Sequence, residues 1–111
     1  MPMPNMQAMM KQVQEMQVKI AQAQAELENR ITSAEAGGGM VKVTVNGKQK
    51  VLSIAIDKEV INPLDAEMLE DLIVAAVNKG IEESQQMAQA EMDNATAGML
   101  PNIPGLNLPG L

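Results

Sequence analysis

A heptad stripe of apolar residues near the start of the chain limits how compact the fold can be. Its members are separated alternately by three and four positions: Met6, Met9, Val13, Met16, Ile20, Ala23 and Leu27. This spacing predicts an amphipathic helix with a coiled-coil seam. We expect the helix over about residues 5–29, a length of roughly 37 Å at ~1.5 Å per residue. Because a compact 100-residue domain has a radius of gyration near ~13 Å, this helix must protrude or pack along an equally long partner.

The composition favours self-association through this seam. The 111 residues include 11 methionines but no cysteine and no aromatic residue. Methionine fills space adaptably but specifies packing weakly. A small domain without disulfides has limited means of stabilising itself. We therefore predict a homodimer whose interface lies on the first helix and contains Met9, Val13, Met16, Ile20 and Leu27.

The middle of the chain predicts a three-stranded antiparallel sheet. Strands are expected at about 31–36, 40–46 and 48–57, with three glycines at positions 37–39 between the first two. Asn46-Gly47 between alternating apolar residues is a strong hairpin signal and predicts a two-residue type I′ turn. That turn would place Val41 opposite Leu52. The predicted core face then contains Val41, Val43, Val45, Leu52, Ile54 and Ile56.

A second long helix is expected over about residues 63–93. It would begin at Asn62-Pro63, since Asn suits the N-cap and Pro the first helical position. From residue 97 onward, repeated proline and glycine predict a flexible tail over 97–111. The predicted fold class is α+β, with a long helix, a three-stranded antiparallel sheet and a second long helix in one domain over residues 1–96.

No arrangement of residues predicts catalysis. The chain lacks His and Cys, which are the commonest general base and the best nucleophile. The glycines at 37–39 lack the spacing of a phosphate-binding loop. Acidic residues at Glu67, Glu70 and Asp71 are expected near a helix N-terminus without a metal. We therefore predict no enzyme activity, no cofactor, no metal and no small-molecule substrate.

The hydropathy of the chain predicts a cytoplasmic protein that does not enter membranes. The longest uninterrupted apolar run, over residues 72–77, has six residues, whereas a membrane-spanning helix needs ~20. The N-terminal residues also lack the basic and apolar regions of a secretory signal.

Basic residues concentrate in the first half of an acidic chain. The net charge is −6, yet residues 1–58 contain seven basic and five acidic residues, whereas residues 59–111 contain one basic and nine acidic residues. The predicted hairpin carries Lys42, Lys48 and Lys50 without an acidic residue between them. We predict that these lysines bind DNA phosphates, with Lys11 and Lys19 as lesser candidates. The alternative is that lysines on an edge strand merely prevent aggregation.

Several segments together resemble the YbaB/EbfC family of small bacterial nucleoid-associated proteins. They lie, in family order and spacing, at residues 6–12, 38–47, 56–57, 68–78 and 105–110. The resemblance covers about residues 5–108. It implies a homodimeric α/β protein with a tweezer-like outline that binds DNA and acts in nucleoid organisation or gene regulation. It implies no catalytic residues and no agreed DNA-contact set, so the lysine assignments depend on the charge pattern.

Two functions remain open at this point. The leading hypothesis is a cytoplasmic, nucleoid-located homodimer that binds double-stranded DNA with low sequence specificity, because no arginine in the lysine patch can contact guanine bidentately. The alternative is a coiled-coil protein-interaction adaptor or a prefoldin-like holdase that uses the adaptable methionine surface.

Overall fold

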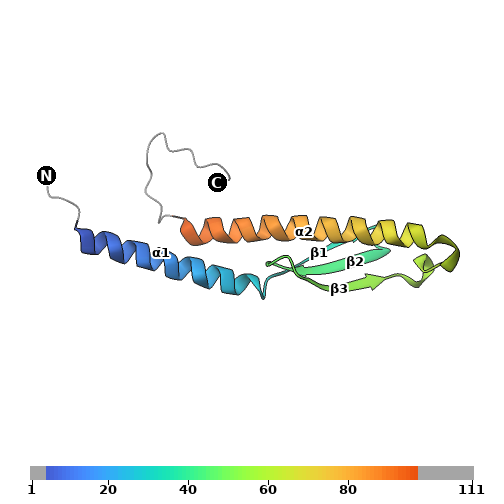
Figure 1. Ribbon diagram of the computed structural model, residues 1–111, viewed down its shortest axis with the longest axis horizontal. Coiled ribbons are helices and arrows are strands. Elements are labelled where there is room, and N and C mark those ends of the chain that lie inside the picture. Colours follow the sequence, from blue (N-terminus) through green and yellow to red (C-terminus); the bar gives the residue numbers. More distant parts are fainter. Residues whose placement is uncertain (1–4, 98–111) are drawn as a thin grey trace, which may run out of the picture.

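The structure is a computed structural model that describes residues 5–97 (Figure 1). The elements in chain order are helix α1 (Met6–Leu27), strands β1 (Ile31–Ala36), β2 (Val41–Asn46) and β3 (Val51–Ile56), 3-10 turns η1 (Lys58–Val60) and η2 (Pro63–Asp65), and helix α2 (Ala66–Thr96). This order confirms the predicted α+β fold class. The expected single domain over 1–96 stays a prediction, and residues 98–111 of the expected tail lie outside the described residues.

The two helices make the molecule a long rod. It measures 77 × 28 × 16 Å and has a radius of gyration of 20.8 Å, well above the ~13 Å of a compact chain of this size. Helices α1 and α2 are antiparallel and overlap over only part of their lengths, so that the N-terminal end of α1 projects past the end of α2 (Figure 1). The heptad helix therefore packs on α2 at one end and protrudes at the other.

Side-chain caps set the beginnings of both helices. The Asn5 side-chain oxygen accepts the backbone N–H of Gln7 at 3.1 Å, ahead of α1. The second helix begins in two steps. Asn62 accepts the N–H of Leu64 at 3.0 Å and starts the turn η2, and Asp65 then accepts the N–H of Met68 at 3.3 Å and caps α2. The helix that the sequence predicts from Pro63 thus begins at Ala66, after a 3-10 turn. The reason is that Asn62 caps the turn and Asp65 caps the helix.

Helix α2 covers one face of the sheet, which has the order β1-β2-β3. The core lies between α2 and the first two strands and contains Ala34, Val41, Val43, Val45 and Ala76. A close approach of the helix permits this packing. A Cβ added at Gly80 would lie 2.7 Å from a methyl carbon of Val43 and 2.8 Å from one of Val45. Gly80 is therefore needed where α2 crosses β2.

The register predicted for the hairpin of β2 and β3 is wrong by four residues. Val41 lies opposite Ile56 instead of Leu52, and Val43 lies opposite Ile54. A bulge then shifts the pairing so that Val45 lies opposite Val51. The predicted core face is correct for β2, whose three valines are fully buried, but wrong for Leu52 and Ile54, which are 46% and 43% exposed. These two residues lie beyond the edge of α2.

The predicted type I′ turn is also wrong. Such a turn needs positive φ at both central residues, but the positive φ in this loop is at Gln49, at 62°. The loop closes through the Asn46 N–H, which donates to the Lys50 carbonyl at 2.9 Å, and the Gln49 N–H, which donates to the Asn46 carbonyl at 3.1 Å. This pattern matches a longer hairpin with a left-handed residue after the turn.

Tertiary packing explains why Gly47 is required although its φ is ordinary. Its N–H donates to the carbonyl oxygens of Leu27 at 2.8 Å and Arg30 at 2.9 Å. A Cβ added at Gly47 would lie 2.7 Å from the Leu27 carbonyl oxygen. The hairpin loop therefore closes the C-terminal end of α1, whose last carbonyl groups lack partners within the helix.

Candidate nucleic-acid interface

Hydrogen bonds fix the backbone of the hairpin loop that carries Lys48 and Lys50. The side-chain oxygen of Asn46 accepts the backbone N–H of Lys48 at 2.9 Å and that of Lys50 at 3.0 Å. Asn46 is itself 3% exposed, and its amide group donates to the Glu28 carbonyl at 3.4 Å. Both lysines are exposed, in contrast to this buried anchor. The loop therefore presents two cations together.

Helix α2 fixes the same loop from the other side. The hydroxyl of Ser84, which is fully buried, donates to the Asn46 carbonyl at 2.5 Å. The Gln49 side chain donates to the Ser84 hydroxyl at 3.3 Å and to the Gly47 carbonyl at 2.9 Å. The loop is thus joined to α1 through Gly47 and to α2 through Ser84. The sequence signal at Asn46-Gly47 predicted a turn but gave no indication of these contacts, because their partners are distant along the chain.

Lys42 lies apart from the loop, on the face of the sheet that α2 leaves open. It sits near the opposite end of β2, opposite Glu35 on β1, and the Lys42 ammonium is 3.9 Å from the Glu35 carboxylate. Both side chains are more than half exposed. An exposed pair at this distance contributes little to stability, but the carboxylate reduces the local positive potential that Lys42 would offer a phosphate.

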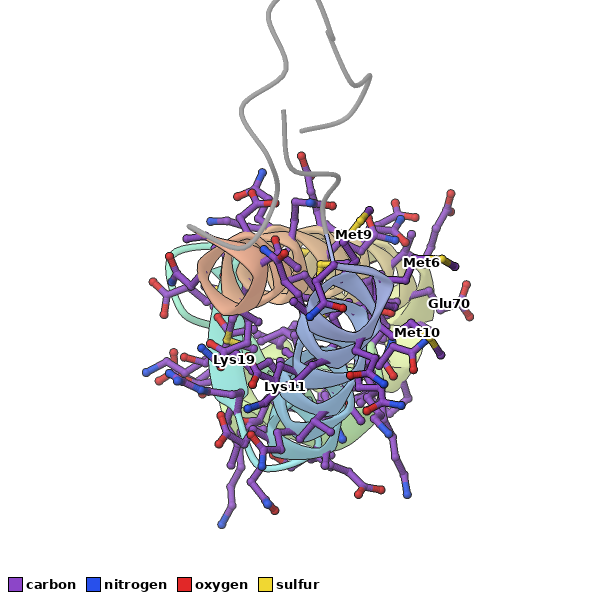
Figure 2. The ribbon with its side chains drawn as sticks, turned by 90° about the vertical axis from the view of Figure 1, so that its left-hand side faces the viewer. Met6, Met9, Met10, Lys11, Lys19 and Glu70 are labelled. Atoms are coloured by element: carbon purple, nitrogen blue, oxygen red, sulfur yellow. The ribbon has the colours of Figure 1, made fainter. Side chains whose placement is uncertain are left out.

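The two lysines of α1 lie on the projecting helix. Lys11 and Lys19 are exposed and lie on one side of α1, whereas Met6 and Met10 lie on the other (Figure 2). Arg30, which follows the helix, is paired instead with Glu91 of α2 at 3.2 Å. The five predicted lysines are therefore not one compact patch. The structure brings Lys48 and Lys50 together and distributes the others along the rod.

The opposite end of the rod is acidic. Residues 57–71, which include the two 3-10 turns and the start of α2, contain six acidic residues and one lysine. Glu67, Glu70 and Asp71 are all exposed. Within residues 5–97, no group of three or more metal-ligating side chains could hold an ion. Carboxylates repel phosphates, so this end of the rod is an unfavourable surface for DNA.

The residues predicted for the dimer interface fall into two groups. Leu27 is 6% exposed and packs against the hairpin loop of its own chain, and Ile20 and Met16 are half-buried. Met9 and Val13 are 53% and 49% exposed. Leu27 is therefore part of the packing within one chain, and the predicted interface on the other α1 residues stays a prediction.

The sequence did not predict that an apolar surface on β3 is left uncovered. Val43 and Ile54 lie directly opposite each other, yet Val43 is fully buried and Ile54 is 43% exposed. The difference arises because α2 packs on β1 and β2, and β3 forms the edge of the sheet farthest from α2 (Figure 1). The alternation of β3 indicated an apolar face, but only the position of α2 determines that this face is left open.

The fold has a counterpart of similar shape. A crystal structure of an uncharacterized protein from Helicobacter pylori superimposes with a TM-score of 0.70, covering 83% of this chain and 97% of that chain at 21% sequence identity. At that identity the likeness concerns the fold alone. Within residues 5–97, no helix is both long enough and apolar enough to span a membrane. The chain is thus an elongated α+β protein with long helical arms.

Sequence comparisons assign the chain to a family. Residues 3–99 match the model of the YbaB/EbfC DNA-binding family. A nucleoid-associated protein of Syntrophobacter fumaroxidans is 54% identical over 102 residues, covering 92% of this chain and 91% of the relative. One from Chlorobium luteolum is 54% identical over 100 residues, covering 90% of each chain. The chain belongs to the YbaB/EbfC family of nucleoid-associated, DNA-binding proteins, which confirms the resemblance seen in the sequence.

Proposed function

We propose that this protein binds double-stranded DNA through phosphate contacts, with low sequence specificity, as a homodimer. The observation that carries the proposal is the hairpin loop, which carries the exposed Lys48 and Lys50 on a backbone held by Asn46. Within residues 5–97, neither lysine has a carboxylate within 4.0 Å. Lys42, Lys11 and Lys19 would add weaker contacts along the rod. No arginine accompanies the loop, so the contacts favour phosphates over base edges.

The location and the cellular role follow from the same proposal. The relatives named above are nucleoid-associated proteins, which supports a place in the cytoplasm, on the nucleoid, for this chain. A role in organising the nucleoid or regulating genes would require little base recognition. A net charge of −6 and few cations per chain favour weak, salt-dependent binding.

Two surfaces could hold the dimer together. The sequence predicts Met9, Val13 and Met16 on α1. The structure adds the open face of β3, where Leu52 and Ile54 are exposed beside the buried valines of β2. We favour the β3 face, because a second copy placed there would extend an existing core and also cover a free strand edge, which otherwise invites uncontrolled pairing. A dimer would present each lysine twice.

The DNA proposal is tested by binding across a salt series. Lys42, Lys48 and Lys50 are changed together to Gln, and duplex DNA binding is followed by fluorescence anisotropy from ~50 to ~200 mM salt. We expect weaker binding and a log–log salt slope reduced by about 1 for each lost phosphate contact. The control changes Lys58, which lies in the acidic segment 57–71, and Lys79, which precedes Glu82 and Glu83 on α2, to Gln and should leave the slope unchanged.

The result also separates this function from its alternative. Circular dichroism must first show that both variants are folded. If the triple variant binds as tightly as the parent at ~50 mM salt, where electrostatic binding is strong, the lysine surface is wrong. If the parent itself does not bind duplex DNA there, a protein-interaction adaptor or holdase becomes the better proposal. The exposed Met6, Met9 and Met10 are the observation that favours that alternative.

A further inference from the structure

The projecting end of α1 has an apolar side with no partner among the described residues. The end of α2 (Asn94 and Ala95) and its C-cap residue Ala97 lie beside Lys19 and Ala23 of α1, so α1 continues past them without a helical neighbour (Figure 1). Met6, Met9 and Met10 are each more than half exposed. With Val13 and Gln14 they line a shallow groove of about 320 Å³. A patch of flexible apolar side chains of this kind is typical of a binding surface.

The sequence that follows α2 has the chemistry to fill this groove. Residues 98–111 have no charged side chain and contain a tandem repeat, Asn102-Ile103-Pro104-Gly105-Leu106 followed by Asn107-Leu108-Pro109-Gly110-Leu111. Each repeat encloses Pro-Gly between two apolar residues. Pro-Gly favours a type II turn, in which the flanking residues approach within ~7 Å. Each repeat would therefore offer a pair of apolar side chains.

We propose that residues 98–111 bind the methionine groove on α1 of the same chain. The segment starts at Ala97, beside Lys19. From Lys19 to Met6 along α1 is roughly 20 Å at ~1.5 Å per residue, whereas 14 extended residues reach about 46 Å. The segment can therefore cover the groove even when turns shorten it. The sequence predicts that Met9 and Val13 contact a second copy of the chain. Here they would instead contact residues 98–111 of the same chain.

Tethering and charge both favour this occupant. A short flexible connection gives the attached segment an effective concentration in the ~mM range, above that of a second copy at ~μM concentration. Neither the groove nor the segment has a charged side chain, so neither would attract DNA phosphates. Lys11 and Lys19 lie on the other side of α1 from Met6 and Met10 (Figure 2). The docked segment would therefore leave these lysines free.

Because the chain contains no cysteine, paired cysteines can test the docking. Val13→Cys and Leu106→Cys are combined in the full chain, and disulfide formation is followed under mild oxidation. The control combines Val18→Cys with Leu106→Cys, since Val18 is 55% exposed and nearer to Ala97 than Val13 is, but outside the groove. We expect the Val13 pair to close about tenfold faster, a ratio equivalent to ~1.4 kcal/mol.

Mixing unlabelled and ¹⁵N-labelled chains identifies the occupant. Disulfides formed within single chains support the proposal, whereas disulfides that mainly join labelled to unlabelled chains assign the groove to a second copy and overturn it. Equal rates for the Val13 and Val18 pairs would also overturn it, because the segment would then have no preferred position.

A second measurement leaves the groove itself unaltered. Hydrogen exchange of residues 6–18 is compared between the parent and a variant with Leu106→Ser and Leu111→Ser, and the control carries Asn102→Ser and Asn107→Ser. We expect faster exchange on α1 only when the leucines are replaced. Unchanged exchange in the leucine variant would refute docking.

Discussion

At the scale of single residues, the glycines mark where the backbone of one element touches another. Gly80 allows α2 to lie directly on Val43 and Val45, and Gly47 allows the hairpin loop to reach the Leu27 carbonyl. Neither position has a positive φ. Their requirement is therefore steric, and a substitution is costly because a side chain would need space that the packed neighbours already fill.

We predict that Gly80→Ala destabilises the protein by about 1–3 kcal/mol, the usual cost of overpacking. Helix propensity alone would make the Gly80→Ala variant more stable by ~1 kcal/mol. The sign of the change in unfolding free energy therefore distinguishes overpacking from helix propensity. The measurement is urea unfolding followed by circular dichroism. Ala75→Gly, at an exposed position of the same helix, reports the propensity term. A more stable Gly80→Ala variant would show that α2 can move away from β2 without cost.

At the scale of elements, α1 combines a packed half with a free half. Ala23 and Leu27 are buried against the rest of the chain, whereas Met6, Met9 and Val13 are exposed. One uninterrupted heptad stripe therefore serves two environments. The alternating spacing of three and four positions continues through both halves of α1. The change from exposed to buried side chains occurs where α2 ends beside α1.

Substitutions at the two kinds of position should differ sharply. We predict that Leu27→Ala lowers the free energy of unfolding by about 2–5 kcal/mol, because it removes a buried side chain and leaves a cavity beside Gly47. Val18→Ala, at a residue 55% exposed on the same helix, should stay within ~0.5 kcal/mol. Chemical denaturation of both variants checks the difference. Equal losses would mean that the buried end of α1 does not depend on this packing.

At the scale of the whole molecule, charge and apolar surface are separated along the rod. The loop of Lys48 and Lys50 lies where α1 meets the sheet, the acidic residues lie at the far end, and the open β3 face lies between them on the edge of the sheet. A second copy on β3 would place two lysine loops and two projecting α1 helices in one particle. This arrangement would increase the number of phosphate contacts without raising the charge of the chain.

We predict that Ile54→Asp converts the proposed homodimer into a monomer, because a charge would enter the face that a second copy would cover. Val74→Asp is the control, since Val74 is 58% exposed on α2, outside the core face. Light scattering over a micromolar concentration range measures the mass of each variant. If Ile54→Asp remains dimeric while Val13→Asp dissociates, the interface lies on α1, as the sequence predicts.

Local patterns in the sequence were enough to predict the elements and the faces of the sheet. The heptad stripe gave α1, the alternation of Val41, Val43 and Val45 gave the buried face of β2, and the Asn62-Pro63 pair marked the turn that leads into α2. These features depend on residues a few positions apart, whose spacing sets which side chains share a face. The register error of four residues kept Ile54 and Ile56 on the face of the β2 valines, because an even shift keeps the alternation, but the bulge put Val51 opposite Val45 on that face as well.

Only the tertiary structure decided which of those faces are covered. The hairpin turn departs from its sequence preference because Gly47, Asn46 and Gln49 bond to Leu27, Glu28 and Ser84, which are distant along the chain. The apolar face of β3 and the first half of α1 are open because α2 packs on other strands and ends early. A sequence pattern specifies an apolar face locally, but the length and position of a distant helix determine whether that face is buried in the same chain or left for a partner.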